Sequence, residues 1–344
     1  MTPSLVMRAA RRSDLDALMD LADLSGPGFT SLPVDEHLME TRLALSEAAF
    51  AGRVSQPQTG KFLMMLEDTA TGTVAGCSAV KAGVGVDRPF FNYRIITVSQ
   101  ASESADRRFD MDALILTNEF VGYTEVGTLF LRPDRRGGGA GRLAAQARYL
   151  LMAAAPDAFG DRILSELRGV VDDAGNSPFW DCLGVHFFRM TFPEADFLSA
   201  VSGNQFILDL MPKYPIYVDI LPPEGREVIG RVHPQGVGAL KLLEWEGFRF
   251  NRVVDIFDGG PMVTCERARI RTIRDSRHAT LQAGDPAERD GGWLISSDRL
   301  PDFRVTAAAG QLRGGDTLIV APDTLDRLHM KPGDTARIVE WSRP

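Results

Sequence analysis

Cysteine is scarce in this chain of 344 residues, and the three that occur, Cys77, Cys182 and Cys265, lie far apart. None belongs to a Cys-x-x-Cys pair, so the sequence predicts neither a disulfide framework nor a thiolate metal site. Histidine is almost as rare, with five residues scattered along the chain. We therefore expect no bound metal ion, and the cysteine usage fits a reducing cytoplasm.

Positive charge and long apolar runs are also in short supply. Lys and Arg number 38 against 46 Asp and Glu, which gives a formal net charge of −8. A chain with this balance does not attract the phosphates of nucleic acid or of a membrane surface, so we expect neither partner. No segment approaches the roughly 20 apolar residues of a membrane span, and the N-terminus does not resemble a secretory signal. These absences predict a soluble, cytoplasmic protein.

The most informative segment that is present covers residues 131 to 143, which read Leu-Arg-Pro-Asp-Arg-Arg-Gly-Gly-Gly-Ala-Gly-Arg-Leu. An apolar strand leads into a glycine loop, and apolar residues then recur at helical spacing from Leu143 to Ala154. Glycines let the backbone approach a ligand closely, and free N–H groups at a helix N-terminus attract an anion. The segment therefore predicts a pyrophosphate site that includes Arg136, Gly137, Gly139 and Gly141.

Two other interpretations of this loop remain open. Gly139, Gly141 and Ala144 also satisfy the dinucleotide pattern Gly-x-Gly-x-x-Gly/Ala, for which Asp161 or Asp172 could supply the ribose carboxylate. A dinucleotide fold turns directly from strand to glycine loop, whereas here a proline and two arginines intervene, which disfavours this pattern. The loop could also be a surface turn with solvated arginines, but the amphipathic helix that follows argues against it.

The spacing of Arg136, Gly139 and Gly141 resembles the Arg/Gln-x-x-Gly-x-Gly/Ala pattern with which the GNAT acyltransferases hold the diphosphate of coenzyme A. The order of elements along the chain agrees with this resemblance. We expect strands and helices in the following order: strand, turn and helix from residue 5, a hairpin at 61–67 and 73–81, strands at 91–98 and 125–131, helix 139–155, and strand 163–171. Residues 99 to 115 are polar and predict no element.

Two later segments, 177–188 and 239–248, both resemble the closing helix of a GNAT core, and we assign that role to the second because a hairpin over 248–266 follows it. Residues from about 176 to 230 then form a helical insertion, which recurrent prolines divide into short pieces. We predict an α/β fold with a mixed sheet, in which 1–266 is the GNAT-like acyl-CoA N-acyltransferase core and 267–344 a small β-rich C-terminal unit.

Several longer blocks give the chain a more specific resemblance, to the arginine N-succinyltransferase family. They span nearly the whole chain and comprise Gly28-Phe-Thr-Ser-Leu-Pro33, Phe91-Asn-Tyr-Arg94, Thr128-Leu-Phe-Leu131, Glu166-Leu-Arg-Gly169, Ser177-Pro-Phe-Trp180, Leu210-Met-Pro-Lys-Tyr-Pro-Ile-Tyr217, Val232-His-Pro-Gln235 and Asp255-Ile-Phe-Asp-Gly-Gly-Pro261. The resemblance implies transfer of succinyl from succinyl-CoA to the α-amine of L-arginine. It also implies no permanently bound cofactor, and an oligomer of identical chains or a pair with a paralogous subunit.

The resemblance also implies roles for three residues. His233 corresponds to the histidine that the family uses as proton donor, and an imidazole with a pKa near 6.5 suits that task. Glu125, at the start of the strand before the glycine loop, stands where GNAT enzymes often keep a general base. Leu129 aligns with a position that contacts succinyl-CoA. The residues alone leave simpler roles open: a cap for His233, a solvated carboxylate for Glu125, and core packing for Leu129.

Substrate recognition requires a cation for the succinyl carboxylate and acceptors for the arginine guanidinium. Arg94 and Arg168 are candidates for the first task, and Asp255 and Asp258 for the second, although Asp258-Gly-Gly also suits an ordinary hairpin turn. The alternatives to an arginine N-succinyltransferase are an N-acyltransferase for another amine, such as ornithine, or for another acyl-CoA, and a non-catalytic partner subunit.

Overall fold

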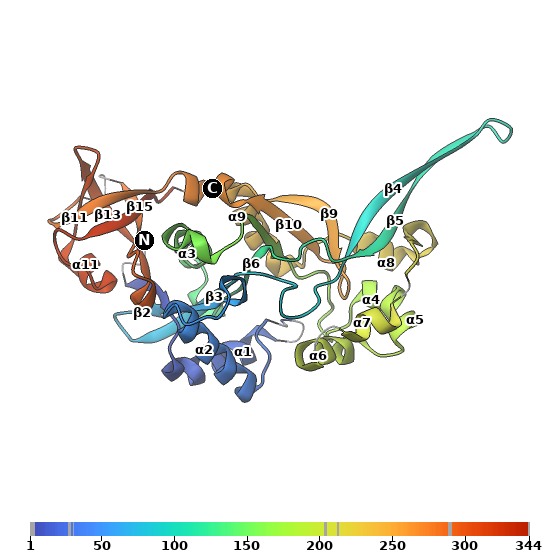
Figure 1. Ribbon diagram of the computed structural model, residues 1–344, viewed down its shortest axis with the longest axis horizontal. Helices are drawn as coiled ribbons and strands as arrows, with labels where there is room; N and C mark the ends of the chain where they lie inside the picture. The colour runs from blue at the N-terminus through green and yellow to red at the C-terminus, as the bar shows by residue number, and fades with distance from the viewer. Residues whose placement is uncertain are drawn as a thin grey trace.

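The computed structural model describes residues 4–26, 29, 31–202, 205–211, 213–287 and 291–342, so Gly28, Thr30 and Pro212 of the blocks quoted above lie outside it. Figure 1 shows an elongated molecule with the C-terminal strands at one end and a long hairpin projecting from the other. The first half contains β1 (Leu5–Ala9), α1 (Leu15–Ser25), α2 (Glu36–Phe50), β2 (Lys61–Asp68), β3 (Thr73–Lys81), β4 (Asn92–Ser102), β5 (Arg107–Thr117), β6 (Thr124–Leu131), α3 (Ala140–Ala154) and β7 (Arg162–Glu166).

The second half begins with a run of short helices, which confirms the predicted insertion. It contains α4 (Pro178–Cys182), α5 (Gly184–Phe188), α6 (Phe192–Ser202), α7 (Gln205–Leu210), β8 (Ile216–Tyr217) and α8 (Pro223–Val228). The closing helix and hairpin, also as predicted, are α9 (Val237–Glu246), β9 (Arg249–Asp255) and β10 (Pro261–Glu266). The remainder forms α10 (Arg271–Arg274), β11 (Arg277–Ala283), β12 (Gly292–Ser296), β13 (Arg304–Arg313), β14 (Thr317–Val320), α11 (Pro322–Leu328) and β15 (Thr335–Glu340).

One hydrogen-bonded sheet connects all of these strands, in the order β12-β15-β11-β14-β13-β1-β2-β3-β6-β7-β10-β9-β4-β5-β8. Most neighbours are antiparallel, but β6 and β7 run parallel and α3 joins them. The predicted β-α-β unit is therefore present, although β7 ends at Glu166 rather than continuing to residue 171. The mixed sheet with helices on its faces confirms the predicted α/β fold.

The alternation of side chains along β2 explains how helices cover both faces of the sheet. Phe62, Met64 and Leu66 pack in one buried cluster with the apolar stripe of α3, whereas Leu63 and Met65 pack in another with α1 and α2. The short helices of the insertion have their own cluster around Trp180, which includes residues of β4 and β9. Helix α3 is fixed further because the Ser78 hydroxyl donates to the Ala144 carbonyl at 3.0 Å.

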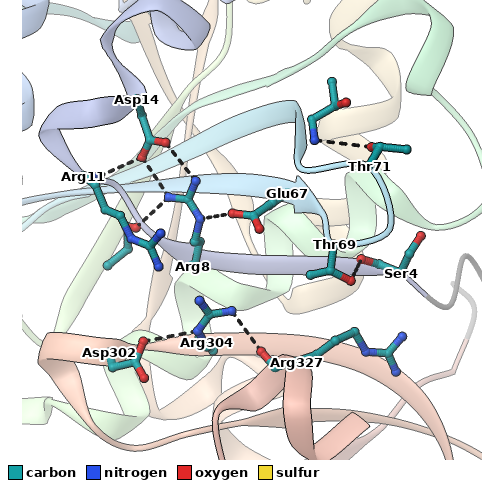
Figure 2. Close-up of polar contacts among 12 residues, drawn as sticks. Ser4, Arg8, Arg11, Asp14, Glu67, Thr69, Thr71, Asp302, Arg304 and Arg327 are labelled. Atoms are coloured by element: carbon teal, nitrogen blue, oxygen red, sulfur yellow. Dashed lines mark hydrogen bonds and ion pairs between the residues drawn. The ribbon is translucent and has the colours of Figure 1, made fainter. Parts of the chain in front are cut away.

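The C-terminal strands join the rest of the molecule through β13, which pairs with β1 as well as with β12 and β14. They keep a separate apolar cluster around Leu281, Ile295 and Leu318. Figure 2 shows buried arginines on both strands of the joint. Arg8 of β1 donates to both carboxylate oxygens of Asp14 at 2.8 Å each. The predicted division after residue 266 stays a prediction.

The residues that predicted no element, 99–115, form most of the β4–β5 hairpin. The polar run over residues 99–108 concealed it, because the tip of this hairpin extends into solvent, where burial is not required. Among the helices that the structure describes, none is long and apolar enough to cross a membrane.

The buried ion pair at the joint gives a stability prediction. Arg8→Ala leaves the Asp14 carboxylate, only 6% exposed, without its cation, and we expect unfolding free energy to fall by about 3–5 kcal/mol. Arg12→Ala is the matched control, because the Arg12–Glu47 ion pair is solvent-exposed and should contribute about 0–1 kcal/mol. Urea unfolding of both variants measures the difference, and equal losses would contradict the prediction.

Candidate active site

The glycine loop lies between the end of β6 and the start of α3. A single 3-10 turn, Pro133–Arg135, follows β6, and the chain then passes through Gly137, Gly138 and Gly139 with φ angles of 106°, 59° and 94°. Residues with a side chain rarely adopt such angles, which explains the three glycines. Gly139 caps a helix of 15 residues without a side chain, and the Ala140 N–H donates to the Gly137 carbonyl at 3.0 Å, so an anion at this helix N-terminus would be met next by the Gly141 N–H.

Arginines surround this loop. Arg136 is exposed and reaches back to the Leu131 carbonyl at 3.4 Å, while Arg135 pairs with Asp68 at 3.3 Å. Arg142, in the first turn of α3, stacks on the Trp341 ring at 3.8 Å from its centroid. The local charge is therefore positive although the chain as a whole is negative, which is what binding of a diphosphate requires.

The carboxylates that a dinucleotide site would need are engaged elsewhere. Asp161 pairs with Arg267 at 2.9 Å, and Asp172 accepts hydrogen bonds from the backbone N–H and side-chain amide of Asn176. The 3-10 turn also separates β6 from the glycines. The local geometry thus favours a coenzyme A loop over a dinucleotide loop.

Strands β6 and β7 are paired at their beginnings alone. Their ladder joins Thr124 to Ile163 and Glu125 to Leu164, and the Ser165 hydroxyl then donates to the Val126 carbonyl at 2.9 Å. In the described part of the chain, no further ladder pair joins the two strands. Past Val126, the backbone of β6 is therefore available to a ligand that enters between them.

A β-bulge lies on β6 at this point of divergence. The register with β3 shifts between Cys77 and Ala79, so that Thr128 and Leu129 together face Ser78. Thr128 has a φ of 51°, which is strained for a β-branched residue. The half-buried Leu129 side chain packs against the main core. If Leu129 binds succinyl-CoA, its backbone groups would therefore make the contact.

His233 lies beside the chain that leaves β7. Its backbone N–H donates to the Arg168 carbonyl at 2.8 Å, and its Nδ1 accepts from the Gln235 N–H at 3.2 Å, which caps the turn Pro234–Gly236. This bond places the proton of the neutral ring on Nε2. Burial and the nearby Arg168 guanidinium lower the pKa of His233 below 6.5, so the ring is neutral near neutral pH.

The two predicted aspartates lie in the turn between β9 and β10. Asp255 accepts from the N–H groups of Phe257 and Asp258, and Asp258 accepts from those of Gly169 and Gly260 at 2.6 and 2.8 Å. A Cβ on Gly169 would lie 2.3 Å from the Asp258 carbonyl oxygen, so the two loops are in tight contact. Both carboxylates thus stabilise the turn. That they also bind the guanidinium of a substrate arginine stays a prediction.

These aspartates belong to a larger cluster of carboxyls that lie within electrostatic reach of one another, with Glu166 and Asp196 as further members. Burial, followed by the charge of Asp255, raises the pKa of Asp258 to about 8 and that of Asp196 to about 6. Glu166, at the end of β7, has a pKa raised well above its ordinary value by burial and by the charges of Asp255 and Glu125. Burial also raises the pKa of Glu125, while Lys81 lowers it. A cation that enters this space would stabilise the ionised carboxylates.

Glu166 and Asp196 were not among the predicted site residues. Glu166 belongs to one of the family blocks, which was a usable signal, but Asp196 lies in the insertion and carries no local pattern. The two predicted arginines lie apart from one another. Arg168 is within electrostatic reach of Asp258 and Asp196, whereas Arg94 makes an exposed ion pair with Glu119 at 2.5 Å. Their binding of a succinyl carboxylate stays a prediction.

The comparisons with known proteins agree along the full length of the chain. Two family models match, "Arginine N-succinyltransferase beta subunit" over residues 5–272 and its C-terminal domain over residues 277–340. The arginine N-succinyltransferase of Escherichia coli (strain 55989 / EAEC) is 41% identical over 336 residues, or 97% of each chain. That of Shigella flexneri is equally similar, at 41% identity over 97% of each chain.

A solved structure has the same fold. Subunit AI of the arginine/ornithine succinyltransferase from Pseudomonas aeruginosa is 31% identical, and the two structures superpose with a TM-score of 0.90 over 99% of each chain. The predicted family resemblance is thereby confirmed: this chain belongs to the arginine N-succinyltransferase beta subunit family.

Proposed function

We propose that this chain transfers succinyl from succinyl-CoA to the α-amine of L-arginine, with both substrates bound at once. The observation that carries the proposal is the divergence of β6 from β7 beyond their first ladder pairs, with the glycine loop following the end of β6 and with His233 and the cluster of carboxyls beside the end of β7. The names of the relatives, together with their identity along the whole chain, supply the substrates.

The donor site follows from the glycine loop. The N-terminus of α3 and Arg136 hold the diphosphate of coenzyme A, with Gly137, Gly139 and Gly141 allowing the close approach. The pantetheine arm then extends along β6 past Leu129, where the backbone makes no ladder bond to β7. This direction brings the thioester to the end of β7, where His233 lies.

The acceptor site follows from the cluster of carboxyls. L-Arginine carries a guanidinium and an ammonium, and a space in which Glu166, Asp196 and Asp258 have raised pKa values favours a ligand that brings positive charge. Ornithine would bring the same number of cationic groups, and the Pseudomonas relative is named for both amino acids. Another amine, or another acyl-CoA, is therefore the second candidate reaction.

The proton path uses Glu125 of β6 and His233, which lies beside the chain that leaves β7. Glu125, whose raised pKa suits a general base, takes one proton from the ammonium, and the free amine attacks the thioester carbon. As the C–N bond forms and the C–S bond breaks, the ring of His233 in its imidazolium form gives its Nε2 proton to the departing thiolate, and its lowered pKa makes it a ready acid. The ring is then neutral, and the second amine proton returns to it through water. The products are N-succinylarginine and coenzyme A.

The same proposal includes an oligomeric state and a cellular location. Members of this family include proteins named as subunits, so we place the chain in an oligomer of identical copies or in a pair with a paralogous chain. The three cysteines are free, which fits work in the cytoplasm. A non-catalytic subunit is the alternative, although His233 and the glycine loop are both intact.

The reaction itself is tested by thiol release from succinyl-CoA with the purified chain. We expect release with L-arginine, less with L-ornithine, and none without an amine or with acetyl-CoA as donor. Release with ornithine but not with arginine would identify ornithine as the acceptor. Binding of succinyl-CoA without release under any condition would identify a non-catalytic subunit.

Two variants distinguish proton donation by His233 from its capping of the turn Pro234–Gly236. His233→Ala should lower kcat by about 10²–10⁴, and His233→Asn, whose amide oxygen can still accept from Gln235, should lower it equally because it cannot give up a proton. Succinyl-CoA affinity should change little in both. Recovery of activity in the Asn variant would show that His233 acts as a cap only. In an NMR titration, the His233 ring should titrate below pH 6.5.

The donor site is tested by charge reversal in the loop. Arg136→Glu should weaken succinyl-CoA binding at least tenfold in calorimetry, with a smaller effect at high salt because the interaction is electrostatic. Arg53→Glu reverses an exposed arginine outside the loop and serves as the control. An equal affinity in the two variants would show that the diphosphate binds elsewhere.

A further inference from the structure

The β4–β5 hairpin extends well beyond the rest of the sheet, as Figure 1 shows. Strand β9 pairs with β4 as far as Arg94, and β8 pairs with β5 at Ala113 and Leu114 alone. From Thr97 and Asp112 outward, the two strands pair only with each other among the described strands, as far as Ser102 and Arg107. A two-stranded hairpin is only marginally stable in water by itself, so this arm gains stability if another surface covers it.

The two faces of the arm differ in polarity. Pairs of opposite residues share a face, and one face carries Ile96, Val98, Phe109 and Met111. Phe109 is 48% exposed. The other face carries polar residues and is held by Arg252, which donates to Thr97 and Asp112 at 3.0 and 2.8 Å. Ile96, Val98 and Met111 are half-buried, whereas Phe109, nearest the tip, projects into solvent.

The two edges of the arm differ as well. Arg252 has a φ of 58° and reaches the β4 edge, where its Nε donates to the Ile95 carbonyl at 3.4 Å. From Arg107 to Asp112, no described strand pairs with the outer edge of β5. An edge strand of this length is a template for another strand, and β5 is the more accessible of the two edges.

The order of charges on β5 indicates what pairs with it. The segment reads Arg107-Arg108-Phe109-Asp110-Met111-Asp112, with its basic end first and its acidic residues after Phe109. In an antiparallel pair of two such strands centred on Phe109, Arg108 of each copy lies opposite the partner's Asp110, and the two Phe109 rings meet at the axis. In the described structure, neither Arg108 nor Asp110 has a side-chain hydrogen bond or ion pair within its own chain.

We propose that the β4–β5 arm docks on a second copy of this chain, by antiparallel pairing of the two β5 strands about Phe109. Such pairing is closed by a two-fold axis and joins the sheets of both copies into one. It covers the exposed Phe109 and gives each Arg108 a carboxylate. The inference goes beyond the proposed reaction and does not depend on which amine is acylated.

Charge exchange tests the pairing, with molar mass measured by light scattering and sedimentation. We expect the wild-type chain to be a dimer, or a larger assembly built of dimers. Arg108→Asp and Asp110→Arg should each weaken the β5 contact at least tenfold, because each places two like charges opposite each other at both ends of the pair. The double variant R108D/D110R should restore the contact, because its reversed charges again face opposite charges.

Two further variants control this experiment. Phe109→Asp should weaken the contact without rescue, whereas Arg313→Asp, at an exposed arginine on β13, should leave it unchanged. A monomeric wild-type chain, or an assembly that all arm variants leave intact, would overturn the proposal. Succinyl-CoA binding by the same variants reports on the proposed function separately, since none of the substituted residues is assigned to the donor site.

Discussion

The divergence of two parallel strands is the constraint on which the rest of this structure depends. Strands β6 and β7 are neighbours in one sheet, yet two ladder pairs and one serine hydroxyl join them before they part. The bulge at Thr128, with its positive φ, turns the β6 backbone at the same level. Much of what is assigned to chemistry lies along or at the ends of these strands: Glu125 on β6 and the glycine loop after it, and Glu166 at the end of β7 with Arg168 and its neighbour His233 beyond it.

The groups near the ends of the two strands carry opposite charges. The end of β6 leads to the N-terminus of α3 and to arginines, which suit a diphosphate, whereas the end of β7 lies near carboxyls whose burial raises their pKa values. Buried carboxyls are costly to ionise without a cation. An anionic donor would thus be attracted to the end of β6 and a cationic acceptor to the end of β7. This arrangement suits a reaction in which both substrates are bound together.

The C-terminal strands take part in the same architecture. Strand β13 continues the sheet from β1, and Trp341, which follows β15, stacks with Arg142 beside the glycine loop. A Cβ on Gly139 would lie 3.2 Å from the Trp341 ring. The last residues of the chain therefore help to fix the first turn of α3, the part of the helix that faces the proposed diphosphate.

The sequence by itself determined the glycine loop, the hairpins and helices of the core, the short helices of the insertion and the family, because these rest on local periodicity, turn chemistry and motif spacing. It could not determine which carboxyls gather, since Glu166, Asp196 and Asp258 are far apart in the chain and acquire raised pKa values only through shared burial. Nor could it predict the β4–β5 arm, whose exposed residues need no apolar pattern. Tertiary structure decided both, because burial and long-range strand pairing are properties of the folded chain alone.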